Sequence, residues 1–226
     1  MNTELTDTHD HATTDITVDG NAQVSARPDT ILLRMELKGT APAYDQALQA
    51  VDSRTRQLME AMTECGIHET LVTERFDIEE VWRDRYDDSK RALEGYCAKH
   101  HVEVRMPLDM GLLNRFLQRI ARSEIQPGIR VIFENRDPRP MMEEARVQAL
   151  ASARASAQHI AEQMGLKLTG IRSIRYTTPP VAAPFSLQVE LPDLQPRACL
   201  SLDTSIRPDD VTVRDGVSVV WKAVAA

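Results

Sequence analysis

The sequence predicts an α+β protein in which long strands of a mixed or antiparallel sheet pack against helices. Two observations carry this prediction. In several long segments hydrophobic residues alternate with polar ones, which is the pattern of a half-buried strand. Between those segments hydrophobic residues recur at three- and four-residue steps, which is the pattern of an amphipathic helix.

The first strands and the first helix follow from these two periods. Residues 1–15 show no hydrophobic periodicity and are predicted to be a disordered tail. The chain becomes strand-like after residue 15, pauses at Gly20, and alternates most strictly over residues 31–37. After Gly39 the period becomes helical until Gly66, which predicts a helix of about six turns.

The strands and the helix expected over residues 71–134 complete a known order of secondary-structure elements. Two strands are expected over residues 71–82 and 93–106, joined as a hairpin by a charged connector. Asp109 is a suitable N-cap for a second amphipathic helix, and a short strand over residues 129–134 follows it. The order from residue 31 is therefore strand, helix, strand, strand, helix, strand. This is the split βαβ order of ferredoxin-like folds.

The last third of the chain begins with the longest predicted helix, which ends at Gly165. Between Ala145 and Ala161 this helix carries seven alanines, which we interpret as a sign of close packing against a neighbouring element.

A strand through Ile171 follows that helix. Residues 177–210 then hold six of the twelve prolines, a density that excludes a central strand. A final alternating strand covers residues 211–224 and needs an earlier sheet to pair with. We therefore expect one domain over residues 16–226 with a proline-rich loop at about 177–210.

Charge and composition restrict the class of function. The chain has 34 acidic and 27 basic residues, a net charge of -7, and only two Trp, four Tyr and four Phe residues, which disfavours nucleic-acid binding. No uninterrupted apolar run reaches the roughly 20 residues of a membrane-spanning helix. The polar N-terminus lacks the features of a secretory signal, so a cytoplasmic location is expected.

Common catalytic and ligand-binding motifs do not occur in the sequence. Neither glycine-rich phosphate loops nor the H-E-x-x-H and G-x-S-x-G motifs are present, and the three cysteines do not have the spacing of a metal or redox motif. We therefore assign no catalytic, cofactor-binding or metal-binding residue and expect no cofactor. Whether the chain is an enzyme stays open, and a non-enzymatic role is favoured.

The densest group of polar residues lies at residues 96–101, on a predicted strand. Cys97 and His100 point to opposite faces of that strand, and Cys97 and His101 lie roughly 13 Å apart along it, so neither pair forms a catalytic dyad. His100 shares the apolar face with Tyr96. It is interpreted as a hydrogen-bonded core histidine, and Tyr96 and His100 are the candidates for lining a pocket.

Several short stretches together resemble the SIMPL domain (DUF541) family, which includes periplasmic immunogenic proteins of the Brucella type. These stretches cover residues 16–39, 66–67, 72–73, 95–96, 144–168 and 209–223. The resemblance implies an α+β domain, a tendency to form homo-oligomers that are sometimes ring- or barrel-like, and no established catalytic residues. A periplasmic role is not carried over, because no signal peptide is recognised.

Two hypotheses about function follow. The first is a non-enzymatic protein that associates with itself or with a protein partner, because long strands offer unpaired backbone groups at sheet edges. The second is a small-molecule-binding protein or enzyme with a pocket between the sheet and the helices, near Tyr96 and His100.

Overall fold

The computed structural model describes residues 13–83, 92–177, 186–189 and 208–226. Within them the chain forms three helices and eight strands in two sheets, which confirms the predicted α+β class. By its contacts the chain divides into two compact units. We call Arg27–Arg136 with Ala183–Val211 the ferredoxin-like unit, and Met1–Ala26, Asp137–Ala182 and Thr212–Ala226 the α3 unit. That residues 16–226 form one domain stays a prediction.

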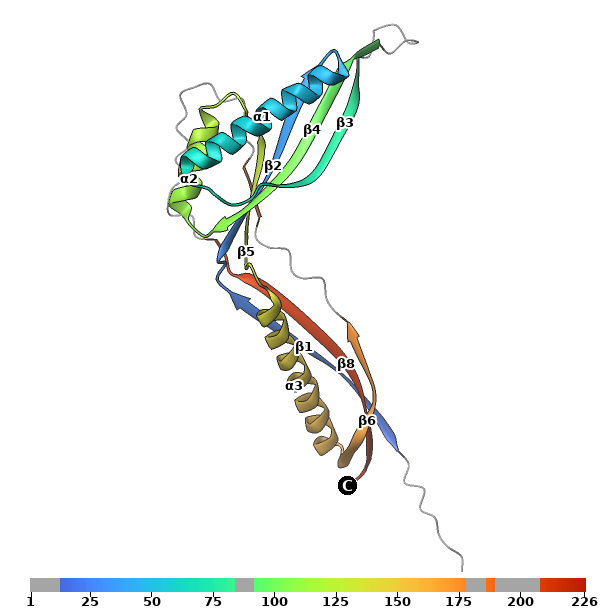
Figure 1. Ribbon diagram of the computed structural model, residues 1–226. Helices are drawn as coiled ribbons and strands as arrows, with labels where there is room; N and C mark the ends of the chain where they lie inside the picture. The colour runs from blue at the N-terminus through green and yellow to red at the C-terminus, as the bar shows by residue number, and fades with distance from the viewer. Residues whose placement is uncertain (1–12, 84–91, 178–185, 190–207) are drawn as a thin grey trace, which may run out of the picture. The chain divides into compact units, whose positions relative to one another are not determined.

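The ferredoxin-like unit contains a five-stranded sheet with two helices on one face (Figure 1). Its elements are β2 (Thr30–Ala41), α1 (Tyr44–Cys65), β3 (Val72–Arg83), β4 (Ala92–Pro107), α2 (Met110–Ala121), β5 (Gly128–Glu134) and β7 (Ser186–Val189). The strand order is β3-β4-β2-β5-β7 with antiparallel neighbours. The first four of these strands have the ferredoxin-like arrangement that the element order predicted.

Local signals set the ends of the two helices. At the C-terminus of α1, Gly66 adopts a left-handed conformation with φ of 86°, and the N–H of Ile67 donates to the carbonyl of Met62. Glycine suits that conformation because it has no Cβ. At the N-terminus of α2 the side chain of Asp109 accepts a hydrogen bond of 2.9 Å from the N–H of Leu112, which confirms the predicted N-cap.

The core of the ferredoxin-like unit lies between the sheet and its helices. Alternate residues of β2 are buried there with helix residues such as Leu58 and Phe116. On the other face of β2, Arg34 pairs in register with Glu103 and carries an ion pair to it. The strict alternation in the sequence thus corresponds to a strand with one apolar and one polar face.

The α3 unit is a three-stranded sheet with one long helix on one face (Figure 1). Its elements are β1 (Thr14–Ala26), α3 (Arg139–Gln163), β6 (Leu166–Thr177) and β8 (Val211–Ala225), and its strand order is β1-β8-β6. β1 begins just before the predicted boundary of the tail. Residues 1–12 and most of the predicted proline-rich loop lie outside the described residues.

An alanine stripe brings α3 close to β1. Its members are Ala145, Ala149, Ala153, Ala157 and Ala161, and each is at most 2% exposed. They recur every fourth residue and therefore lie on one side of the helix. Opposite them, a Cβ added to Gly20 would lie 2.1 Å from the carbonyl oxygen of Ala149. The close packing of the helix that the alanines predicted is therefore confirmed. The predicted pause at Gly20 was wrong, because β1 runs through this residue without interruption.

Candidate functional site

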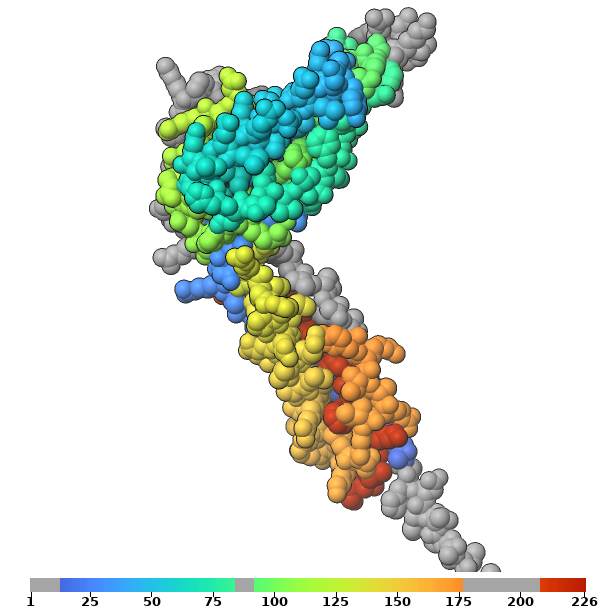
Figure 2. Space-filling view, in the orientation of Figure 1, coloured from blue at the N-terminus to red at the C-terminus, as the bar shows by residue number. Residues whose placement is uncertain are grey.

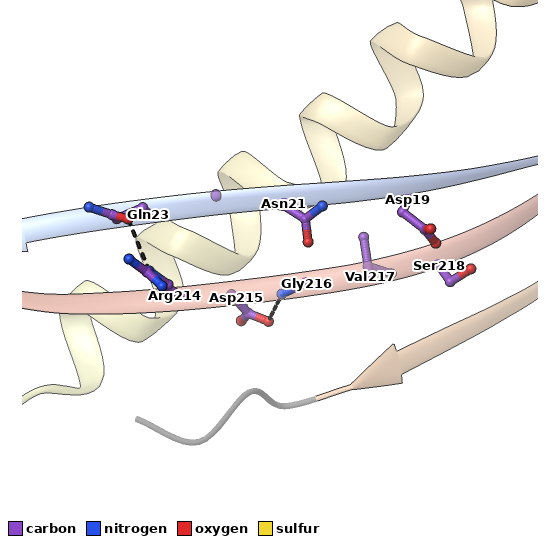
Figure 3. Close-up of a pocket in the computed structure, with 9 residues that line it drawn as sticks. Asp19, Asn21, Gln23, Arg214, Asp215, Gly216, Val217 and Ser218 are labelled. Carbon is purple, nitrogen blue, oxygen red and sulfur yellow. Dashed lines mark hydrogen bonds between the residues drawn. The ribbon is translucent and has the colours of Figure 1, made fainter. Parts of the chain in front are cut away.

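One hollow lies on the α3 unit and was not expected from the sequence. It has a volume of about 640 Å³ and is lined by Asp19, Asn21, Ala22, Gln23, Arg214, Asp215, Gly216, Val217 and Ser218. The polar side chains follow β1 and β8 side by side, and Arg214 Nε donates a hydrogen bond of 3.0 Å to Gln23 Oε1 (Figure 3). Sequence patterns missed this hollow because its two strands lie at opposite ends of the chain.

Asp215 is the one charged residue of this hollow that is buried, at 5% exposure. Its carboxylate accepts a hydrogen bond of 2.6 Å from the Tyr176 hydroxyl and one of 2.7 Å from the N–H of Gly216. Arg146 Nε lies 3.8 Å from the same carboxylate and donates to the Tyr176 oxygen at 3.2 Å. The hydrogen bond to Tyr176 raises the pKa of Arg146. This cluster joins α3, β6 and β8, and both carboxylate oxygens are already engaged.

In the ferredoxin-like unit, His100 is hydrogen-bonded through both ring nitrogens. Its Nδ1 lies 3.0 Å from the Thr55 hydroxyl on α1, and its Nε2 lies 2.9 Å from the Thr73 hydroxyl on β3. The Thr55 hydroxyl donates its proton to the carbonyl of Val51, so toward His100 it can only accept. The proton of the neutral imidazole therefore sits on Nδ1, and Nε2 accepts from Thr73.

A cleft of about 390 Å³ adjoins His100 on the α1 side of the sheet. It is lined by Leu48, Gln49, Val51, Asp52, Thr55, Phe76 and His100. Tyr96 does not line it, because its ring packs edge-on against Tyr44 with the ring centres 5.7 Å apart. The structure therefore places only one of the two pocket candidates, His100, at this cleft. Both nitrogens of that histidine are engaged, so it forms a wall of the cleft.

The protonation of His100 is expected to make the protein less stable in acid. Burial first, and then the nearby His101, lower the pKa of His100 below its ordinary value. The unfolded chain then binds the proton more readily than the folded chain. Stability is therefore highest above the ordinary histidine pKa of about 6.5 and falls as the pH drops from there through the lowered value.

Urea unfolding at a series of pH values, compared between the native chain and His100→Gln, measures this contribution. Glutamine does not titrate, so the loss of unfolding free energy between neutral and mildly acidic pH should be smaller in His100→Gln. His68→Gln is the control, because His68 is exposed in the same unit. If the unfolding free energy depended on pH in the same way in all three proteins, His100 would not be the group whose lowered pKa reduces stability in acid.

The cysteines and the possible metal ligands of the described residues are the remaining candidates. Cys65 and Cys97 are free thiols, and burial raises the pKa of Cys65, which disfavours its nucleophilic form. Within the described ranges no group of three His, Cys, Asp or Glu side chains is arranged to hold a metal ion. None of the described helices is long and apolar enough to cross a membrane. His9, His11 and Cys199 lie outside the described residues.

Fold and sites together define an α+β protein with a ferredoxin-like unit and a second unit in which a helix packs on a three-stranded sheet. The chain belongs to the SIMPL family, described as "Protein of unknown function (DUF541)", which matches residues 16–221. It is similar to the 26 kDa periplasmic immunogenic proteins of Brucella abortus (strain S19) and Brucella melitensis biotype 1. Each is 25% identical over 178 residues, which cover 76% of this chain and 70% of the relative.

These relatives correct the predicted cytoplasmic location. That prediction was wrong, because both curated relatives are named as periplasmic proteins. It rested on the polar character of residues 1–15 alone.

Proposed function

We propose that this chain is a non-enzymatic protein that associates with further copies of itself through the sheet edges of the α3 unit. The observation that carries the proposal is the exposure of β6. This strand is an edge of its sheet within the described residues, and every residue of the run 171–176 is exposed. Two isoleucines belong to this run, Ile171 at 47% and Ile174 at 55% exposure. A long exposed edge with apolar side chains favours pairing with another strand.

The two edges of this sheet carry opposite charges. β1 contains Asp15 and Asp19 and no basic residue, whereas β6 contains Lys167, Arg172 and Arg175 and no acidic residue. Asp15 and Arg172 form an ion pair of 2.7 Å within the chain, so the contact between copies is assigned to Asp19, Lys167 and Arg175. Pairing β1 of one copy with β6 of the next brings opposite charges together, while pairing two β6 strands brings like charges together. The charges therefore favour a head-to-tail contact between copies, which closes into a ring when the rotation between copies permits.

The edge strand β3 of the ferredoxin-like unit is less suited to such a contact. It carries six charged residues of both signs, at Glu74, Arg75, Asp77, Glu79, Glu80 and Arg83. Its pairing with β4 is also interrupted by two register shifts. Charges and bulges on an edge strand are features that hinder pairing with another chain. The proposal therefore assigns the contact to the α3 unit.

Light scattering coupled to size-exclusion chromatography at tens of micromolar tests the proposal. We expect a mass well above the 25.4 kDa of one chain. Reversing the charge of β6 with Lys167→Glu and Arg175→Glu should lower the mass, because acidic β1 then meets an acidic β6. Adding Asp19→Lys should restore part of it. Arg115→Glu, an exposed change on α2, is the control, and a strict monomer of the native chain would contradict the proposal.

A small-molecule site at the His100 cleft is a second proposal. Its support is a cleft of about 390 Å³ that combines the apolar side chains of Leu48 and Phe76 with the polar side chains of Gln49 and Asp52. Such a combination of apolar walls and a few polar groups is common in ligand sites. The names of the relatives further support a periplasmic setting for this chain.

A further inference from the structure

We propose that a groove between α3 and β6 binds a small amphiphilic carboxylate, an apolar chain that ends in one carboxyl group. The groove has a volume of about 420 Å³ and is lined by Leu150, Arg154, Ile171, Ile174, Val219 and Trp221. It lies on the face of the three-stranded sheet, whereas the contact between copies proposed above uses the edges of that sheet. Both proposals use the exposed side chains of Ile171 and Ile174, so self-association and ligand binding are measured separately below.

The groove exists because α3 covers only part of its sheet. The alanine stripe holds the helix close to β1, where Gly20 leaves room for it. β6 lies two strands away in the order β1-β8-β6. The surface of β8 is consequently visible between α3 and β6, as the red region between the yellow helix and the orange strand in Figure 2. The exposed apolar side chains beside it belong to α3 and β6, whereas Val219 of β8 is 2% exposed and packs in the core under α3.

The apolar lining indicates what the main part of the ligand is. Ile171 and Ile174 from β6, Val219 from β8 and Leu150 from α3 all line the groove. Three of these four side chains are also exposed large hydrophobic residues of the described chain, namely Leu150, Ile171 and Ile174. An apolar chain bound there removes their surfaces from water, which is the main favourable contribution to the binding of such ligands.

Arg154 indicates the charge of the ligand. It lines the groove, and no hydrogen bond or ion pair joins it to another described residue. Arg146, two helical turns earlier, is in contrast engaged by Tyr176 and Asp215. A free guanidinium beside apolar walls favours a ligand with one anionic group, because a charge-assisted hydrogen bond to a carboxylate is stronger than one between neutral groups.

Trp221 gives a second, separate indication that the ligand carries an acceptor oxygen. This residue lines the same groove, and its indole N–H is shielded from solvent without an acceptor among the described residues. A shielded donor without an acceptor is unfavourable and uncommon in folded proteins. An acceptor oxygen of the ligand reaches this N–H once a side chain beside the indole moves aside on binding, and that contact relieves the deficit. The groove volume also falls within the range of roughly 300–1,000 Å³ that is typical of small-molecule sites.

Titration of the full-length chain with decanoate tests the proposal. The chain contains two tryptophans, so Trp82→Phe leaves Trp221 as the only one and makes its emission a reporter of the groove. We expect a saturable change in that emission. Arg154→Gln should weaken decanoate binding roughly tenfold or more, because it removes the charged partner. Arg115→Gln, which changes an exposed arginine on a helix of the other unit, should bind as the parent does.

Decanol separates the role of charge from that of apolar burial. It has the same chain length without the carboxylate and should bind the parent chain as weakly as decanoate binds Arg154→Gln. Equal affinities of the parent for decanol and decanoate would overturn the assignment of a carboxylate. The absence of a saturable emission change would overturn the site itself. Light scattering on the same samples measures self-association separately. A failure of the ligand-binding proposal can therefore be distinguished from a failure of the self-association proposal.

Discussion

Replacing Gly20 by alanine is expected to destabilise the α3 unit by about 3 kcal/mol, the upper end of the usual range for overpacking. The added Cβ would lie 2.1 Å from the carbonyl oxygen of Ala149 and 2.7 Å from the Cβ and the backbone nitrogen of Ala153. Two of these three atoms belong to the backbone of α3, so no side-chain rotation relieves the contact. The helix must move away from β1, and the packing of the alanine stripe is then lost.

Urea unfolding followed by the emission of Trp221 in the Trp82→Phe background measures this effect. Gly170→Ala is the matched control, because Gly170 lies in a strand of the same sheet and nothing lies within 4 Å of a Cβ added there. The control should change the unfolding free energy by no more than about 0.5 kcal/mol. Equal effects of the two substitutions would show that α3 does not approach β1 as closely as described.

Replacing Leu58 by alanine is expected to destabilise the ferredoxin-like unit by about 3–5 kcal/mol. Leu58 lies on α1, is 0% exposed and belongs to the core cluster between the helices and the five-stranded sheet. Truncating it removes buried apolar surface and leaves a cavity that a close-packed core fills only in part. Alanine is also a good helix former, so the loss measures packing and not helix propensity.

Met59, the residue after Leu58 on α1, provides the control. Met59 is 51% exposed, so Met59→Ala should change stability by no more than about 0.5 kcal/mol. Both variants are compared by urea unfolding, with Trp82 as the fluorescent reporter in a Trp221→Phe background. Similar losses for the two adjacent positions would contradict the placement of α1, because the helix would then not present Leu58 to the sheet.

Several elements of the fold were predictable because their signals are local. The helical period between Gly39 and Gly66 corresponds to α1, and Asp109 caps α2 as its position suggested. The order of strands and helices predicted the ferredoxin-like arrangement. Hydrophobic period and capping residues depend on neighbours a few positions away, so they can be read without knowledge of the rest of the chain.

Gly20 shows where local interpretation failed. A glycine followed by asparagine is typical of a turn, so the sequence suggested a pause in the strand. The structure instead has one continuous strand, β1, and uses the missing Cβ of Gly20 to admit α3. The reason is tertiary, because the residues that need the space, Ala149 and Ala153, lie far along the chain.

The candidate sites were harder to predict from the sequence than the helices and strands. His100 was singled out, but its partners Thr55 and Thr73 come from a helix and a neighbouring strand. Arg154 and Trp221 carry no signal of a site in the sequence, since an arginine on a helix and a tryptophan in a strand are ordinary in their own segments. Their significance depends on their lining one groove.

The sequence by itself determined the fold class, the order of the elements and the apolar face of most of them, because side-chain periodicity follows directly from helix and strand geometry. Only the tertiary structure decided that β1 pairs with β8, so that Gln23 meets Arg214 from the other end of the chain. It also decided that α3 packs close to β1 and leaves a groove beside β6 on the same face of the sheet. Strand partners and helix positions result from packing between distant segments, and no single segment carries that information.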